Sequence, residues 1–128
     1  MTTATQRVES WLKTFEHALN RKDVEKATAL FADECYWRDL VFFTWNIYTS
    51  EGKTQIADML SSCLENVGTT TWKIEGEATG DTAMTEAWLL FESERARGKG
   101  QLRLKDGKAW TLLTTMVELK GHEEKKRH

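Results

Sequence analysis

Residues 36–48 carry the side chains that first suggest chemistry in this chain. The stretch holds six of the thirteen aromatic residues and only two charges, those of Arg38 and Asp39. A carboxylate among aromatic rings is costly to desolvate unless a partner binds it or a reaction uses its affinity for protons. Asp39 is therefore our candidate for a general base. The alternative is that Asp39 ends a strand and accepts hydrogen bonds from the backbone or from an arginine.

Tryptophan is frequent for a chain of 128 residues, with six in all. Tryptophans usually belong to a core, but four of them would overfill a core this small if it had no cavity to line. Asn46 could orient the carbonyl of a ligand, or bond to the backbone of its own loop. The tryptophan and asparagine side chains that we expect to contact a ligand are Trp37, Trp45, Asn46, Trp88 and Trp110.

The composition is that of an ordinary globular protein with one domain. The 18 basic and 20 acidic side chains nearly balance, which removes the electrostatic reason to expect a nucleic acid partner. Neither a signal peptide nor an apolar stretch long enough to span a bilayer is recognised, so we expect a cytoplasmic protein with no membrane role. Residues 1–121 are expected to form the domain and residues 122–128 a charged tail.

No spacing typical of a metal or cofactor site is recognised. Cys35 and Cys63 match neither a zinc-ligand nor a redox-pair pattern, so two buried free thiols in a reducing cytosol are expected. His122 and His128 belong to the tail and have no partner at a spacing suited to a metal. We therefore expect neither a metal nor a cofactor.

Three amphipathic helices are predicted in the first half of the chain. The first begins near Thr3, which has capping-box spacing with Gln6. Its apolar stripe consists of Val8, Trp11, Leu12, Phe15, Ala18 and Leu19. Asp23 can cap a second, short helix. The inward residues of that helix are Val24, Ala27 and Phe31. The third helix has apolar positions at helical spacing over residues 56–67, and Gly68 is placed to end it.

The rest of the chain predicts a sheet. A strand over residues 34–40 places Cys35, Trp37 and Asp39 on one face. Four further strands are expected at residues 69–79, 83–94, 100–105 and 109–119, with turns at Gly80-Asp81, Arg97-Gly98 and Asp106-Gly107. The second and fourth of these strands are apolar or small on both faces. Helices should therefore cover one face, and a second layer or a second subunit the other.

The order of these elements and three segments, residues 15–23, 29–39 and 51–56, resemble the nuclear transport factor 2-like superfamily. That superfamily includes ketosteroid isomerase, the SnoaL-like polyketide cyclases and limonene epoxide hydrolase. The resemblance implies an α+β fold, a cone-shaped α+β barrel in which three N-terminal helices pack on a strongly curved, mostly antiparallel sheet around an apolar cavity. Asp39 takes the position of the isomerase base. Trp37 and Trp45, with Trp88 or Trp110, would wall this carboxylate and disfavour its charged form.

Two other groups that the isomerase needs are missing at the matching positions. The isomerase stabilises its dienolate oxygen with a Tyr on the first helix and a protonated acid on a late strand. Phe15 stands at the first position, where it would line the cavity, and the second position falls near Gly100 or Gln101. Steroid isomerase activity is therefore not expected. Arg38 beside Asp39 does not by itself complete the Asp-Arg-Asp relay of an epoxide hydrolase, since neighbours on a strand face opposite sides.

More specifically, residues 35–40, 43–47 and 112–125 resemble the N-terminal domain that precedes a flavin-containing monooxygenase-like oxidoreductase. No Gly-x-Gly-x-x-Gly stretch is present, so flavin or nicotinamide binding is not carried over, and the chain is either a stand-alone relative or a fragment. Two functions remain open. One is a module that binds a small apolar molecule and acts as an accessory or dimerisation domain for a flavin oxidoreductase. The other is a cofactor-independent isomerase, cyclase or dehydratase with Asp39 as its base. We expect a homodimer through the exposed face of the sheet.

Overall fold

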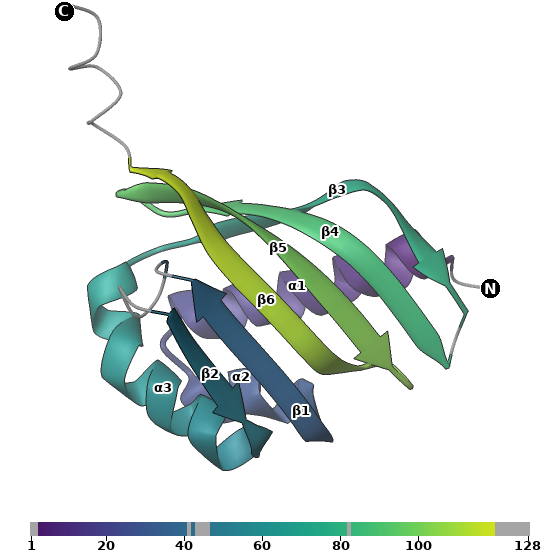
Figure 1. Cartoon of the computed structure of the whole chain (residues 1–128), viewed down its shortest axis with the longest axis horizontal. Coiled ribbons are helices and arrows are strands. Elements are labelled where there is room, and N and C mark those ends of the chain that lie inside the picture. Colours follow the sequence, from purple (N-terminus) through teal and green to yellow (C-terminus); the bar gives the residue numbers. More distant parts are fainter. Residues whose placement is uncertain (1–2, 41, 43–46, 82, 120–128) are drawn as a thin grey trace, which may run out of the picture.

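The computed structural model describes residues 3–40, 42, 47–81 and 83–119 of the chain. The elements follow one another in the order α1 (Ala4–Asn20), α2 (Val24–Ala29), β1 (Phe31–Leu40), β2 (Ile47–Glu51), α3 (Gly52–Val67), β3 (Thr71–Gly80), β4 (Met84–Glu92), β5 (Ala96–Lys105) and β6 (Lys108–Leu119) (Figure 1). The helices pack on a curved six-stranded sheet that is mostly antiparallel. The predicted α+β fold class is confirmed.

The helix boundaries follow the capping signals in the sequence. The Thr3 hydroxyl accepts a hydrogen bond from the Gln6 amide at 3.1 Å, and Gln6 Oε1 accepts one from the Thr3 amide at 2.9 Å, which completes the predicted capping box. Asp23 accepts a bond from the Lys26 amide at the start of α2, and Gly68 ends α3 with a φ of 78°. None of the helices in the described part of the chain is long and apolar enough to cross a membrane.

Helix α2 is shorter than predicted. It ends at Ala29, and Phe31 begins β1 instead of extending the helix. Phe31 is still fully buried, because the start of β1 lies against α1, where the Phe31 and Trp11 ring centroids are 6.0 Å apart. The prediction that Phe31 faces the core is therefore confirmed, and the prediction of its element is wrong.

The six strands form one sheet in the order β2-β1-β6-β5-β4-β3. The pairing of β1 with β6 is parallel, and the other four pairings are antiparallel. Strands β4 and β6 lie inside the sheet, as expected for strands that are apolar or small on both faces. Asp106 and Gly107 join β5 to β6 with φ values of 52° and 85°, which confirms the predicted Asp-Gly turn.

The turn predicted at Arg97-Gly98 is wrong, because both residues lie in β5. The connection from β4 lies at residues 93–95, where the Ser93 hydroxyl accepts hydrogen bonds from two amides of the turn. Gly98 is explained by packing: a Cβ at this position would lie 2.4 Å from the ring of Phe91. A glycine inside a strand can mark the close approach of a side chain as well as a turn.

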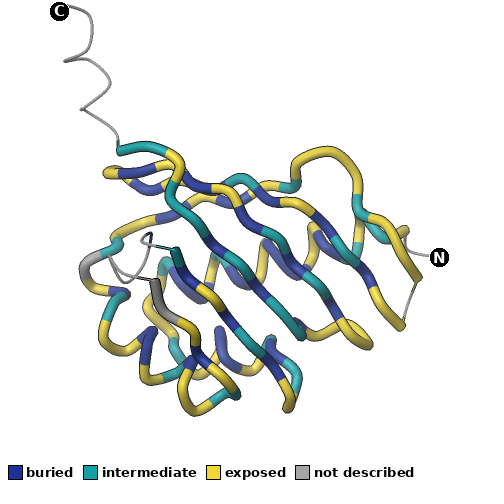
Figure 2. The backbone as a smooth tube through the Cα atoms, viewed as in Figure 1, coloured by how far each residue is buried: buried dark blue, intermediate teal, exposed yellow. Residues whose placement is uncertain are grey.

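The helices cover one face of the sheet, which we name the inner face. Helix α1 packs against β3 and β4, and α3 packs against β1 and β2. No described helix lies over the opposite, outer face, which is turned towards the viewer at β4, β5 and β6 in Figure 1. Burial alternates accordingly along β4, where Ala87, Leu89 and Phe91 are buried and Trp88 is exposed (Figure 2). The core therefore lies between the inner face and the helices.

Helix α1 also covers the open edge of β3. Three amides along this edge donate to side chains of α1: Thr70 to Asn20 Oδ1 at 2.8 Å, Trp72 to Glu16 Oε1 at 2.7 Å and Ala78 to Thr5 Oγ1 at 3.1 Å. Unpaired amides at a sheet edge would otherwise invite pairing with another chain. Helix α1 thus packs on the core and also provides hydrogen-bond acceptors for these three amides at the edge of the sheet.

Candidate functional site

Asp39 lies at the buried end of a short chain of hydrogen bonds. The Thr114 hydroxyl donates to Asp39 Oδ1 at 2.6 Å, and the Trp37 indole nitrogen donates to Thr114 Oγ1 at 2.9 Å. An indole N–H can only donate, and a threonine hydroxyl has one proton, so the direction of both bonds is fixed. All three residues have no exposed surface. The carboxylate is thus held in one orientation.

The strand register explains why these side chains meet. Trp37 and Asp39 are two residues apart on β1, so both point to the inner face with Cys35, as predicted from the period of two. Asp39 pairs with Thr114 across the parallel β1–β6 ladder. Sequence analysis did not find Thr114. The available signal was a polar residue two positions after Leu112, on the same face of the predicted strand.

A cluster of aromatic rings fills the inner face beside this chain. Phe15 lies at its centre, with ring centroids 5.7 Å from Trp37 and 5.3 Å from Trp72. Trp72 stacks on Phe91 at 4.3 Å, and Phe42 meets Phe91 edge-on at 4.6 Å. Such pairs are favourable beyond their buried area. Phe15 and Trp37 are therefore members of the packed core, and their predicted contact with a ligand remains a prediction.

The positions where an isomerase would stabilise an oxyanion offer no side-chain donor on the inner face, since Gln101 donates to Glu86 of the neighbouring strand on the outer face. Phe15 is fully buried and apolar. Gly100 faces inward on β5, and a Cβ there would lie 2.4 Å from the Leu113 carbonyl oxygen, so the backbone leaves no room for a side chain. A base without such donors lacks the electrostatic stabilisation on which enolate chemistry depends.

Helix α3 brings a thiol near the Asp39 carboxylate. Burial raises the pKa of the Cys63 thiol, and the negative charge of Asp39 raises it further. Burial also raises the pKa of Cys35, although Lys53 acts against it. Both cysteines are free. Within the described residues, no group of three or more His, Cys, Asp or Glu side chains could hold a metal ion.

Two of the predicted ligand contacts lie away from Asp39. Trp88 is 53% exposed and lies on the outer face, where it pairs with Gln101 of β5. Trp110 is four residues from Thr114, about 13 Å along β6, and its ring centroid lies 5.7 Å from the Lys105 ammonium. The expectation that Trp88 or Trp110 walls Asp39 is therefore wrong. Trp45 and Asn46 lie outside the described residues.

A pocket of about 350 Å³ opens at the end of the sheet where β3 begins and β4 ends. Its lining residues are Thr71, Trp72, Lys73, Leu90, Phe91, Glu92, Arg97 and Gly98. The volume lies within the range of small-molecule sites, and the lining includes Trp72 and Phe91, whose rings stack on each other. Sequence analysis placed both aromatic residues in strands without assigning them to a site. The register of β3 with β4 pairs them.

Solved structures share this architecture. A ketosteroid isomerase-like protein from Erwinia carotovora atroseptica superposes with a TM-score of 0.77 at 14% identity, covering 92% of this chain and 99% of that one. A domain of unknown function with a cystatin-like fold from Nostoc punctiforme gives 0.75 at 13% identity, covering 97% and 84%. An NTF-2 like protein of unknown function from Shewanella oneidensis gives 0.71 at 13% identity, covering 88% and 99%.

At these identities the structural similarity establishes the fold and no activity. No curated protein matches the chain. The family model of the SnoaL-like domain matches residues 12–116, which include the second half of α1, the Asp39 strand and most of β6. The chain therefore belongs to the SnoaL-like domain family.

Proposed function

We propose that this domain binds a small aromatic or otherwise apolar molecule beside Trp72 and Phe91, without converting it. The pocket itself carries the proposal: its volume of about 350 Å³ suits a small ligand, and its wall holds a stacked aromatic pair. Lys73 and Arg97 line the same pocket. A ligand with an aromatic body and one polar group would match this combination of surfaces.

Asp39 has a structural role in this proposal. A general base has to come within hydrogen-bond reach of the proton that it removes. Asp39 has no exposed surface, and Thr114 holds its Oδ1. From Asp39 the contacts run through Thr114, Trp37 and Phe15 to Trp72, which lines the pocket. The buried chain thus supports the aromatic residues that contact the ligand.

Filling the pocket with an aromatic side chain tests the proposal. Thr71 lines the pocket and is exposed on β3, so Thr71→Trp should occupy part of the space at little cost to folding. The matched control is Thr79→Trp, which places the same ring on the same strand away from these lining residues. With 2-naphthol as the probe in calorimetric titration, the wild type and the control should bind and Thr71→Trp should bind at least tenfold more weakly. Equal binding by both variants, or none by the wild type, would contradict the proposal.

The wider role that we propose is that of an accessory and dimerisation module related to flavin oxidoreductases. Its support is the resemblance of residues 35–40, 43–47 and 112–125 to the domain that precedes such enzymes. We also propose a cytoplasmic location, which the two free thiols favour because a reducing compartment keeps cysteines unpaired. Co-purification with a flavoprotein partner would support the accessory role.

The second candidate function is acid/base catalysis with Asp39 as the base. The observation in its favour is the fixed orientation of the carboxylate by Thr114 and Trp37. Removing a general base lowers a rate by about 10²- to 10⁴-fold. If any ketone exchanges its α-protons faster in the presence of the protein, Asp39→Asn should abolish that effect under this hypothesis. An unchanged rate would remove Asp39 as the base.

A further inference from the structure

The lining of the pocket at the end of the sheet changes from buried and apolar to exposed and polar. Trp72, Phe91 and Gly98 are buried, and Leu90 is half-buried. The exposed lining residues, which we name the rim, are Thr71, Lys73, Glu92 and Arg97. The apolar body of a ligand would therefore meet the buried part, and a polar group of the ligand would meet the rim. The charges of the rim decide which polar group fits.

Arg97 of the rim is matched by acids of its own chain. Its guanidinium pairs with Glu118 of β6 at 3.1 Å. On its other side, Arg97 lies opposite Glu92 in the β4–β5 ladder. Opposite charges on directly paired residues of neighbouring strands attract one another. The charges of Arg97 and Glu92 therefore offset each other at the rim.

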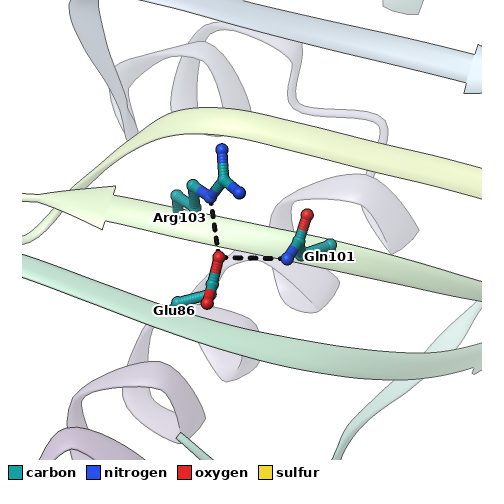
Figure 3. Close-up of polar contacts among 3 residues, drawn as sticks. All are labelled: Glu86, Gln101 and Arg103. Atoms are coloured by element: carbon teal, nitrogen blue, oxygen red, sulfur yellow. Dashed lines mark hydrogen bonds and ion pairs between the residues drawn. The ribbon is translucent and has the colours of Figure 1, made fainter. Parts of the chain in front are cut away.

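Lys73 is the remaining charged residue of the rim, and no acid in the described part of the chain forms an ion pair with it. Two cations of β5 outside the pocket differ in this respect. Lys99 pairs with Glu75 at 3.8 Å. Arg103 pairs with Glu86 at 2.8 Å, as the dashed line between them in Figure 3 shows. The ammonium of Lys73 can therefore meet a ligand without first leaving an acid of the protein.

The β3–β4 ladder places Lys73 next to the aromatic pair. Trp72 lies opposite Phe91, and Lys73 lies opposite Leu90, one step further along both strands. One step along a strand is about 3.3 Å, and the flexible stem of a lysine can carry its ammonium across that distance. Lys73 is exposed where Trp72 is buried, since successive side chains of a strand alternate in direction. Because both residues line the pocket, a ligand in it can contact both.

We propose that the ligand of this pocket is an aromatic monocarboxylate and that Lys73 binds its carboxylate. This inference rests on the proposed function, in which the pocket binds a small aromatic molecule. A lysine ammonium is a compact point charge that only donates hydrogen bonds, which matches a single carboxylate. Charge-assisted hydrogen bonds are stronger than neutral ones, so the anion should bind more tightly than a neutral group of the same shape. A second negative charge on the ligand would lie near Glu92 without a further cation to offset it.

Two probes of the same shape test this ligand class, because 2-naphthoate is an anion at neutral pH and 2-naphthamide is uncharged. Calorimetric titration of the full chain should find 2-naphthoate bound about three- to fivefold more tightly, the factor expected for one exposed ion pair. In Lys73→Met the ratio of the two affinities should fall to about one. Lys73→Arg keeps the charge and should keep most of the preference. Salt at about 1 M should weaken the preference of the wild type, since exposed charges are screened.

Lys99→Met is the matched control, because Lys99 is an exposed lysine of the same sheet that does not line the pocket, and it should keep the wild-type ratio. If Lys73→Met fails to fold by circular dichroism, Lys73→Gln replaces it. A preference that survives the loss of the Lys73 charge, or that Lys99→Met loses equally, would overturn the inference. Binding of 2-naphthol by the wild type without a preference for 2-naphthoate over 2-naphthamide would overturn this inference alone. Failure of the wild type to bind any of the three probes would overturn the proposed function as well.

Discussion

At the scale of single residues, the Thr114 hydroxyl connects the Asp39 carboxylate to the aromatic core through two hydrogen bonds. Thr114→Val keeps the shape and removes both hydrogen bonds, one accepted from Trp37 and one donated to Asp39. Loss of a partner for a buried polar group costs about 1–3 kcal/mol. The free energy of unfolding in urea should therefore fall by about that amount. Thr114→Ser, which retains the hydroxyl, should lose clearly less, and equal losses for the two variants would contradict this role.

The charge of Asp39 can be detected through Cys63. Because Asp39 raises the pKa of the Cys63 thiol, a smaller fraction of the thiol is ionised at a given pH, and alkylation is slower. Asp39→Asn removes the charge and should lower the pKa of Cys63 towards its ordinary value. Alkylation of Cys63 by iodoacetamide, followed by mass spectrometry at mildly alkaline pH, should therefore become faster in the variant.

Cys35 provides the internal control for that measurement. Burial, Lys53 and Asp33 perturb its pKa, and Asp39 does not contribute. The alkylation rate of Cys35 should therefore be the same in both proteins. A parallel increase at Cys35 would mean that the substitution opens the fold, and an unchanged rate at Cys63 would contradict the proximity of a charged Asp39.

Part of the surroundings of Asp39 could be predicted from the sequence. The period of two along β1 places Trp37 and Asp39 on one face. Thr114 lies 75 residues later and reaches Asp39 only through the parallel pairing of β1 with β6. A local pattern has no information about that pairing. For the same reason the sequence did not separate Trp37, on the inner face, from Trp88, on the outer face.

At the scale of elements, α1 protects the edge of β3. Glu16 Oε1 accepts the hydrogen bond of the Trp72 amide at 2.7 Å. Glu16→Ala should lower the free energy of unfolding by about 1–2 kcal/mol and speed hydrogen exchange of the Trp72 amide, because that amide loses its acceptor. Glu16→Gln keeps an acceptor oxygen and should stay close to the wild type. Equal exchange rates in the two variants would contradict a role in edge protection.

Element boundaries were predictable where a local chemical signal sets them. The capping box of Thr3 and the Asp106-Gly107 turn are two such cases, and both are present in the structure. The turn predicted at Gly98 is wrong because tertiary packing requires the glycine: the Phe91 ring occupies the space that a Cβ would need. Phe31 was assigned to a helix since its burial fits either element. Tertiary packing decided both cases.

At the scale of the whole molecule, much more of the fold than of the function could be predicted from the sequence. Periodicity and element order lead to the α+β architecture that the SnoaL-like family model and the solved structures share. The pocket forms where β3, β4 and β5 pair in one register. Solved structures at 13–14% sequence identity do not indicate which ligand this chain binds. The pocket is the surface through which we propose that this domain acts.

The most direct test of the ligand proposal is an NMR titration of the isotope-labelled protein with 2-naphthol. Our account predicts that the largest amide shift changes fall on the residues that line the pocket, among them Thr71, Leu90 and Gly98. Amides near Asp39 and Thr114 should change little. Shift changes centred on Asp39 and Thr114, with the pocket residues unaffected, would contradict the account and favour a site at the carboxylate.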